Sequence, residues 1–164
     1  ASQPNFERLQ YKVVYYDNAG TRLALKPDEA QEIRFNHKGV EVRMISMPNT
    51  IGGGSLFNDN SHIFLRIFID GSLKLFRYYY TQSSPGMYSP STGFSTGMNT
   101  YGAENFVLQK EGAALMQPRG LTFRKDMAEY LKDCPEVVQK IQGRELRRAE
   151  LEIIVMEYNK KCGN

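Results

Sequence analysis

One stretch decides the fold of this chain: Ile63-Phe64-Leu65-Arg66-Ile67-Phe68-Ile69, then Asp70-Gly71, then Ser72 to Tyr80. Two runs of strand-forming residues around an Asp-Gly pair predict an antiparallel β-hairpin, with Asp70 and Gly71 at the positive-φ positions of a type I′ turn. One face is expected to carry Ile63, Leu65, Ile67 and Ile69, and the other Phe64 and Phe68. Because both faces are apolar, we expect this hairpin to form a central pair of strands.

The residues before the hairpin favour further short strands. Strand-forming or alternating runs separated by turn residues occur at Tyr11–Tyr16, Thr21–Leu25, Glu32–Phe35 and Val40–Ile45. A loop is expected from Pro48 to His62. It contains Gly52-Gly53-Gly54 but lacks the following lysine and helix start that a phosphate-binding loop requires, so it is interpreted as a flexible connector.

The composition changes after the hairpin. From Thr81 to Asn105 the chain is rich in Ser, Thr and Gly, with isolated large side chains among them. Such a segment cannot form a core alone, so we expect a long exposed loop that is either mobile or an interface. Its candidate partner contacts are Met87, Tyr88, Phe94, Met98 and Tyr101. Strands are expected to resume at Phe106–Leu108 and Ala113–Met116.

After Pro118 the apolar residues recur at helical spacing. Thr122 can cap a first helix that runs through Leu131, Pro135 suits the first turn of a second helix that ends at Gly143, and a third helix carries an apolar stripe from Leu151 to Tyr158. The sequence therefore predicts one α+β domain over residues 1–164. It consists of an antiparallel β-sheet or partly open barrel over about residues 9–117 and a C-terminal three-helix tail, residues 118–162, packed against it.

Charge and hydropathy exclude two broad classes of protein. The net charge is +3, and 21 basic residues are scattered among 18 acidic ones rather than gathered as in a nucleic-acid binder. The densest basic run, Arg144 to Arg148, is interleaved with Glu145 and Leu146 and is interpreted as a solvated helix face. No stretch approaches the roughly 18 apolar residues of a membrane span.

The sequence contains no recognisable catalytic, cofactor-binding or metal-binding motif. Its two histidines, His37 and His62, lie in or beside turns without neighbouring metal ligands, and both are interpreted as ordinary surface residues. Tyr78-Tyr79-Tyr80 suits either packing within a strand or stacking on a sugar or base. A spatial pair of carboxylates is invisible in a sequence, so a hydrolase acting on glycans or peptides stays open as the alternative function.

Two stretches together resemble exported proteins of unknown function from Bacteroidetes-type bacteria. The first runs from Phe64 to Tyr78, within the hairpin. The second is the tail, with Asp133-Cys134-Pro135-Glu136-Val137-Val138, Ile141, Tyr158-Asn159 and Cys162. The resemblance covers Ile63–Tyr78 and Thr122–Cys162 and implies a periplasmic or cell-surface protein, but no activity. The small polar start, Ala1 to Asn5, suits a mature chain after signal-peptide removal, although an arbitrary first residue would explain the missing Met equally well.

The two cysteines are expected to form a disulfide. Cys134 lies between the first two predicted helices and Cys162 just after the third, so both sulfur atoms reach the same end of the helical layer if the tail folds back. The alternative is two free thiols. We therefore expect a non-enzymatic cell-envelope domain that binds or scaffolds an unidentified protein or glycan, with self-association into a homo-oligomer left open and with no nucleic acid as partner.

Overall fold

The computed structural model describes residues 4–51, 61–84, 88–89, 91, 94–95, 97 and 99–163. Its helices are α1 (Phe6–Leu9), α2 (Phe123–Tyr130), α3 (Pro135–Gln142), the 3-10 turn η1 (Arg148–Glu150) and α4 (Leu151–Lys161). Its strands are β1 (Val13–Tyr16), β2 (Arg22–Leu25), β3 (Glu32–His37), β4 (Val40–Pro48), β5 (His62–Ile69), β6 (Leu73–Ser84), β7 (Tyr88–Ser89), β8 (Phe94–Ser95) and β9 (Asn99–Lys110). The expected α+β class is confirmed.

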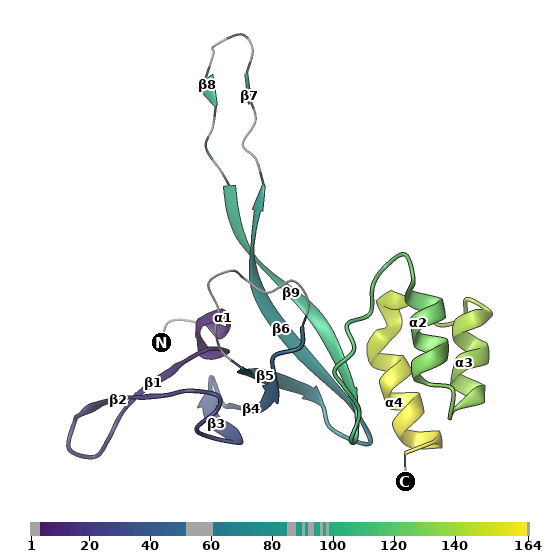
Figure 1. Cartoon of the computed structure of the whole chain (residues 1–164), viewed down its shortest axis with the longest axis horizontal. Helices are drawn as coiled ribbons and strands as arrows, with labels where there is room; N and C mark the ends of the chain where they lie inside the picture. The colour runs from purple at the N-terminus through teal and green to yellow at the C-terminus, as the bar shows by residue number, and fades with distance from the viewer. Residues whose placement is uncertain are drawn as a thin grey trace.

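The main sheet has five antiparallel strands in the order β3-β4-β5-β6-β9. It stays open and does not close into a barrel, so of the two expected forms the open sheet is the correct one. β1 and β2 form a separate hairpin at the end of the molecule opposite the helices, and β6 and β9 continue beyond the sheet as a projecting arm (Figure 1). Gly52, Gly53 and Gly54 lie outside the described residues, so the interpretation of that segment as a connector stays a prediction.

The β5–β6 hairpin is central, as expected, but its turn differs from the prediction. Neither Asp70 nor Gly71 has a positive φ, so the turn is not of type I′. The register slips between Ile67 and Ile69, and this irregularity moves Ile69 to the opposite face from Ile67. The positive-φ pair in the sheet is Lys38 and Gly39, between β3 and β4. The expectation that Ile69 shares a face with Ile63 is therefore wrong.

The helices cover one face of the sheet at one end. Leu73, Leu75 and Leu108 of the sheet pack against fully buried residues of α2, α3 and α4. The apolar stripe expected on the third helix is buried. Pro135 lies in the first turn of α3 and Gly143 ends it, as expected. Thr122 precedes α2, but its hydroxyl binds Asp126 and does not cap the helix. Arg144, Arg147 and Arg148 are exposed, as expected. They lie in the connection between α3 and α4, which includes the 3-10 turn η1, and not on the face of a regular helix. None of the helices in the described residues is long and apolar enough to cross a bilayer.

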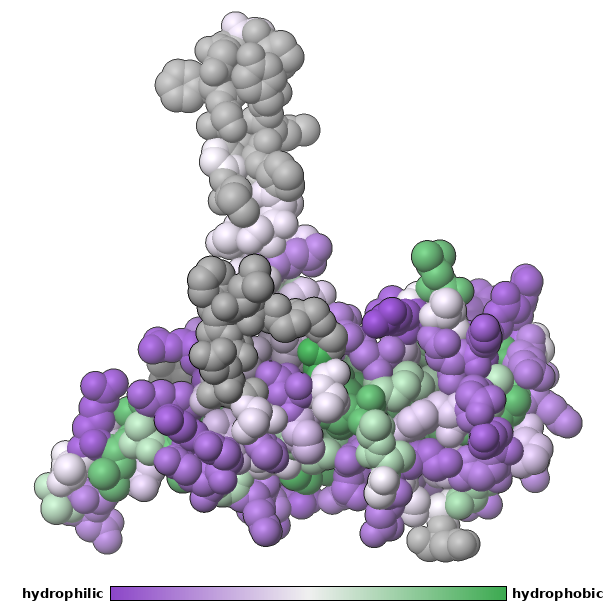
Figure 2. Space-filling view, in the orientation of Figure 1, coloured by the Kyte–Doolittle hydropathy of each residue, from purple (hydrophilic) through white to green (hydrophobic). Residues whose placement is uncertain are grey.

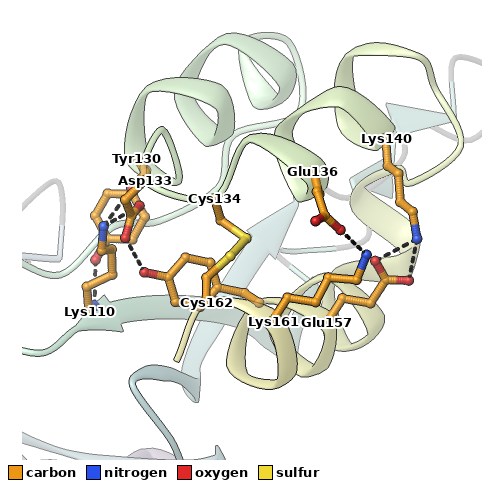
Figure 3. The surroundings of a disulfide bond; sticks show 10 residues. Lys110, Tyr130, Asp133, Cys134, Glu136, Lys140, Glu157, Lys161 and Cys162 are labelled. Carbon is orange, nitrogen blue, oxygen red and sulfur yellow. Dashed lines mark hydrogen bonds and ion pairs between the residues drawn. A yellow bond between two sulfur atoms is a disulfide. The ribbon is translucent and has the colours of Figure 1, made fainter. Parts of the chain in front are cut away.

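A disulfide joins the beginning of α3 to the end of α4, the pairing expected from the sequence. The Cα atoms of Cys134 and Cys162 are 5.8 Å apart. Figure 3 shows the bond between two polar groups: Lys161 binds Glu136 and Lys140 binds Glu157 on one side, and Lys110 binds Asp133 on the other. The Tyr158 hydroxyl also donates to Asp133. The second group links the end of β9 to the helices, because Lys110, the last residue of β9, lies 2.7 Å from the Asp133 carboxylate between α2 and α3.

Candidate functional site

The projecting arm, formed by the ends of β6 and β9, does not pack on the core of the protein. β6 and β9 are paired continuously from Leu73↔Lys110 to Ser84↔Asn99. Thr81, Gln82 and Ser83 on β6 are exposed, as are Thr100, Tyr101 and Gly102 on β9, and the ribbon stands clear of the body in Figure 1. An isolated two-stranded ribbon is at best marginally stable in water. Its extension away from the core therefore favours contact with something else.

The expected long loop at Thr81–Asn105 is wrong at both ends. Residues 81–84 continue β6, and residues 99–105 belong to β9. Sequence alternation did not show this because the arm has no buried face, and an apolar and polar alternation arises only where one face is buried. The Ala113–Met116 strand is also shorter than predicted, since only a single bridge, Leu108↔Met116, is formed there.

The root of the arm is fixed by α1 and the residue after it. Gln10 is fully buried, and its side-chain amide donates to the Tyr79 carbonyl at 2.8 Å and accepts from the Tyr79 N–H at 2.7 Å. Phe6 stacks on the Tyr79 ring at 5.0 Å, and the Arg66 guanidinium lies 4.7 Å from the centre of the Phe6 ring. These contacts hold β6 where it leaves the sheet, so the arm begins from a rigid base.

The three consecutive tyrosines serve mainly as packing residues at this base. Tyr79 is covered by Phe6, and the Tyr78 hydroxyl lies 3.4 Å from that of Tyr11. Tyr78 and Tyr80 stack on each other at 5.9 Å, and burial raises the pKa of Tyr78. Rings that are engaged in this way are poor platforms for a sugar or a base, so the packing interpretation is the better supported of the two.

The candidate contact residues are placed on the arm as far as the structure describes them. Tyr101 is on β9 opposite Gln82, and half of its surface is exposed. Tyr88 and Phe94 lie on the paired strands β7 and β8, where Tyr88 is opposite Ser95 and Phe94 opposite Ser89. Met87 and Met98 lie outside the described residues. The structure therefore places Tyr88 and Phe94 in adjacent cross-strand pairs of the β7–β8 ribbon and Tyr101 closer to the body on β9.

The chemistry of the arm is neutral. From Thr81 to Ala103 the sequence contains no Asp, Glu, Lys or Arg, although 24% of the whole chain is charged. The coloured part of the arm is mostly pale in Figure 2, with one hydrophilic patch near its base, whereas the body carries many strongly hydrophilic residues. Natural proteins protect exposed strand edges with charges, especially lysine, and with proline. The described strand residues of the arm carry neither, which leaves their backbone available for pairing.

Four described acidic side chains, Glu32, Asp70, Asp133 and Glu136, have a clearly shifted pKa. The four acidic groups whose pKa is clearly shifted are all lowered, and a general acid needs the opposite shift. Hydrogen bonds from Arg43 and Arg34 lower the pKa of Glu32 to about 2. The pKa values of Asp70, Asp133 and Glu136 are also lowered, through Arg43, Lys110 and Lys161 respectively. Each of these four carboxylates takes part in an ion pair with a basic side chain at the surface.

The structure shows where the two histidines and the possible metal ligands lie. Within the part of the chain that is described, no group of three His, Cys, Asp or Glu side chains is placed to hold a metal ion. His37 ends β3 and His62 begins β5, each half-buried, and the His62 ring contacts Ser61 at 3.1 Å.

One exposed apolar surface was missed by the sequence interpretation. It lies on the β1–β2 hairpin, where Tyr15 and Tyr16 are exposed together with Val14 and Leu23. Adjacent tyrosines in a four-residue strand were the available signal, but they fit a buried strand equally well.

Comparison of the chain with protein-family models, with curated proteins and with solved structures gave no match.

Proposed function

We propose that this protein is a non-enzymatic binding or scaffolding domain of the cell envelope that engages a protein partner through the β6–β9 arm. One observation carries the proposal: a neutral two-stranded ribbon extends from a rigid root without packing on the core. Surfaces rich in Ser, Gly, Tyr and Asn are typical of adaptable protein-binding loops. A protein partner is favoured over a glycan because Tyr78 and Tyr79 are occupied by packing.

The location in the envelope rests on the disulfide. Disulfides persist in oxidising compartments such as the periplasm and the cell surface and are rare in the cytosol. The Cys134–Cys162 bond supports export, and so does the resemblance to exported proteins.

Site-specific photo-cross-linking in extracts of the source cells tests the proposal. A photoreactive phenylalanine analogue replaces Tyr101 on the arm, and in a matched control it replaces Lys132, which is exposed on the helical body. We expect one discrete protein adduct from position 101 and none from position 132. Adducts of the same pattern from both positions, or none from position 101, would contradict the proposal.

Competition makes the test specific. In an arm-shortened variant residues 81–102 are replaced by Asn-Gly, which closes the hairpin on the paired residues Tyr80 and Ala103. Because the segment removed contributes no core residue among those described, we expect the variant to keep its folded circular dichroism spectrum. Unlabelled wild-type protein should suppress the adduct, and the arm-shortened variant should not.

A further inference from the structure

The outer edge of β9 is open along the part of the strand that leaves the body. Leu108 donates to and accepts from Met116, with both N···O distances 2.8 Å, on the edge that faces away from β6. Backbone groups of alternate residues point to the same edge of a strand. The outer edge therefore continues through Phe106, Glu104, Gly102 and Thr100, and none of these four has a backbone partner there within the described part of the chain.

Proline ends the native pairing at this point. In the antiparallel register of Leu108 and Met116, the next hydrogen-bonded position opposite Phe106 falls to Pro118. Proline has no N–H to donate, so the chain cannot continue the ladder and turns away. The edge from Thr100 to Phe106 is thus left open. At about 3.4 Å per residue it has room for an added strand of about seven residues, or about 24 Å.

A cavity of about 410 Å³ lies where the chain leaves the edge. Its walls include Phe106 of β9, Pro118 and Leu151, which together give it an apolar lining. Arg148 also lines it, is exposed and makes no ion pair among the described residues, whereas Glu104 is paired with Arg77 at 3.5 Å. Arg119, exposed and likewise without an ion pair in the described ranges, adjoins Pro118. The unbalanced charge at this cavity is therefore positive.

We propose that the outer edge of β9, from Thr100 to Phe106, binds an extended segment of a protein partner as an added β-strand. An apolar side chain of that segment occupies the cavity beside Phe106, and an acidic residue lies next to Arg148. Strand addition gives affinity through backbone hydrogen bonds, and pockets for individual side chains give specificity. The inference rests on the proposed function and specifies how the arm binds and what chemistry its partner carries.

The experiment uses the whole protein and a phage-displayed library of random dodecapeptides. Enriched peptides are synthesised with a fluorophore and titrated by anisotropy against wild type, Gly102→Pro, Gly102→Ala and Arg148→Glu. The Gly102 N–H points to the outer edge, so proline removes an outer donor without removing a bond to β6. A Cβ at Gly102 meets nothing within 4 Å, so alanine is the matched control.

We expect Gly102→Pro to weaken binding at least tenfold and Gly102→Ala to change it less than twofold. Arg148→Glu should weaken peptides that carry an acidic residue and should be rescued when that residue is changed to lysine. Unchanged affinity in Gly102→Pro, or no enriched peptide, would overturn the proposal. A wild-type dimer that Gly102→Pro converts to monomer in sedimentation would assign the edge to a second copy of this chain and would also overturn it.

Two further measurements separate the possible failures. Binding that is lost in the arm-shortened variant but kept in Gly102→Pro would leave the proposed function standing and refute strand addition. Equal binding by all variants would refute both. If Gly102→Pro does not fold, amide exchange of the wild type decides instead: peptide should newly protect the amides of Thr100, Gly102, Glu104 and Phe106, and no new protection at these positions would refute the proposal.

Discussion

The side chain of Gln10 pairs with the backbone of Tyr79 as a neighbouring strand would. The amide donates to the Tyr79 carbonyl and accepts from its N–H, while the Gln10 carbonyl accepts the N–H of Phe64 at 2.9 Å. β5 pairs with β6 only between Arg66↔Arg77 and Ile69↔Leu75, and beyond that point no described strand is paired with this edge of β6. Gln10 fills the gap, which allows β6 to leave the sheet with its backbone satisfied.

Replacing Gln10 by alanine should therefore destabilise the protein strongly. The variant leaves both polar groups of Tyr79 without their partner in a part-buried position, and each such loss costs about 1 to 3 kcal/mol. We expect the free energy of unfolding to fall by about 2 to 4 kcal/mol in urea titrations. A variant as stable as the wild type would show that water replaces the amide.

Gln10→Glu provides a matched variant with a pH signature. A carboxylate keeps the acceptor for the Tyr79 N–H but has no donor for the Tyr79 carbonyl, so burial should raise the pKa of the new carboxyl in the folded state. A raised folded pKa means that stability is lost as the pH rises through it. The deficit relative to the wild type should therefore be largest at pH 7 and should shrink below about pH 4.

A second amide holds the other end of the same edge of β6. Asn159 accepts from the Leu73 N–H at 2.7 Å and donates to its carbonyl at 2.9 Å, and a Cβ on Gly71 would lie 2.5 Å from the Asn159 amide nitrogen. Asn159→Ala and Gly71→Ala should each cost about 2 kcal/mol, the first through unpaired groups and the second through overlap. In the double variant the overlap is gone, so the two losses should not add. Strict additivity in the double-mutant cycle would contradict the contact.

The ion pairs on β3 and β4 predict how stability changes in acid. Hydrogen bonds from Arg43 and Arg34 hold the pKa of Glu32 at about 2, below its ordinary value of 4.5. A lowered folded pKa gives stability that is complete above about pH 4.5 and is lost as the pH falls toward 2. Because the pair is partly exposed, Glu32→Gln should cost about 0.5 to 1 kcal/mol at pH 7, and this cost should become small as the pH falls to about 2. Glu41→Gln is the control: Glu41 is exposed and makes no ion pair among the described residues, so this change should have little effect at either pH.

Sequence patterns predicted the parts of the fold whose burial is one-sided. Val42 and Met44 alternate with charged residues and are buried as expected, but Val40, expected on the same face, is 60% exposed at the beginning of β4. Leu151, Ile154, Val155 and Tyr158 recur at helical spacing, and all four are buried as expected. The turn at Asp70 was predicted wrongly because Ile69 pairs with Leu75 after a register shift, so the connection is longer than the two residues of a type I′ turn. Asn159 also lies close to Gly71, and a contact between residues so distant in the sequence has no local signature.

The arm was missed as a continuation of strands for a related reason. Neither face of its described strands is buried, so the sequence shows neither the two-residue alternation of a strand nor the 3.6-residue period of a helix. The buried role of Gln10 had no signal in the sequence, because glutamine is mostly exposed and its partner lies 69 residues away.

The disulfide supplies the last prediction. Cys134 and Cys162 are 28 residues apart, and closing a loop of this size stabilises a protein by about 3 to 4 kcal/mol in the chain-entropy model. Cys162→Ser is the cleaner variant because Cys162 is only half-buried, whereas Cys134 is fully buried and its replacement would also disturb the core. The end of α4 should stay docked in this variant, since Tyr158 still binds Asp133 and Lys161 still binds Glu136.

We therefore expect Cys162→Ser to keep the circular dichroism spectrum of the wild type while its free energy of unfolding falls by about 3 kcal/mol. Wild-type protein unfolded under reducing conditions should show the same loss, because reduction removes the same cross-link without changing the sequence. Under denaturing but non-reducing conditions the wild type should expose no reactive thiol and the variant one. Two reactive thiols in wild type purified from an oxidising compartment would contradict the bond, and an undiminished stability of Cys162→Ser would show that the helices alone close the loop between Cys134 and residue 162.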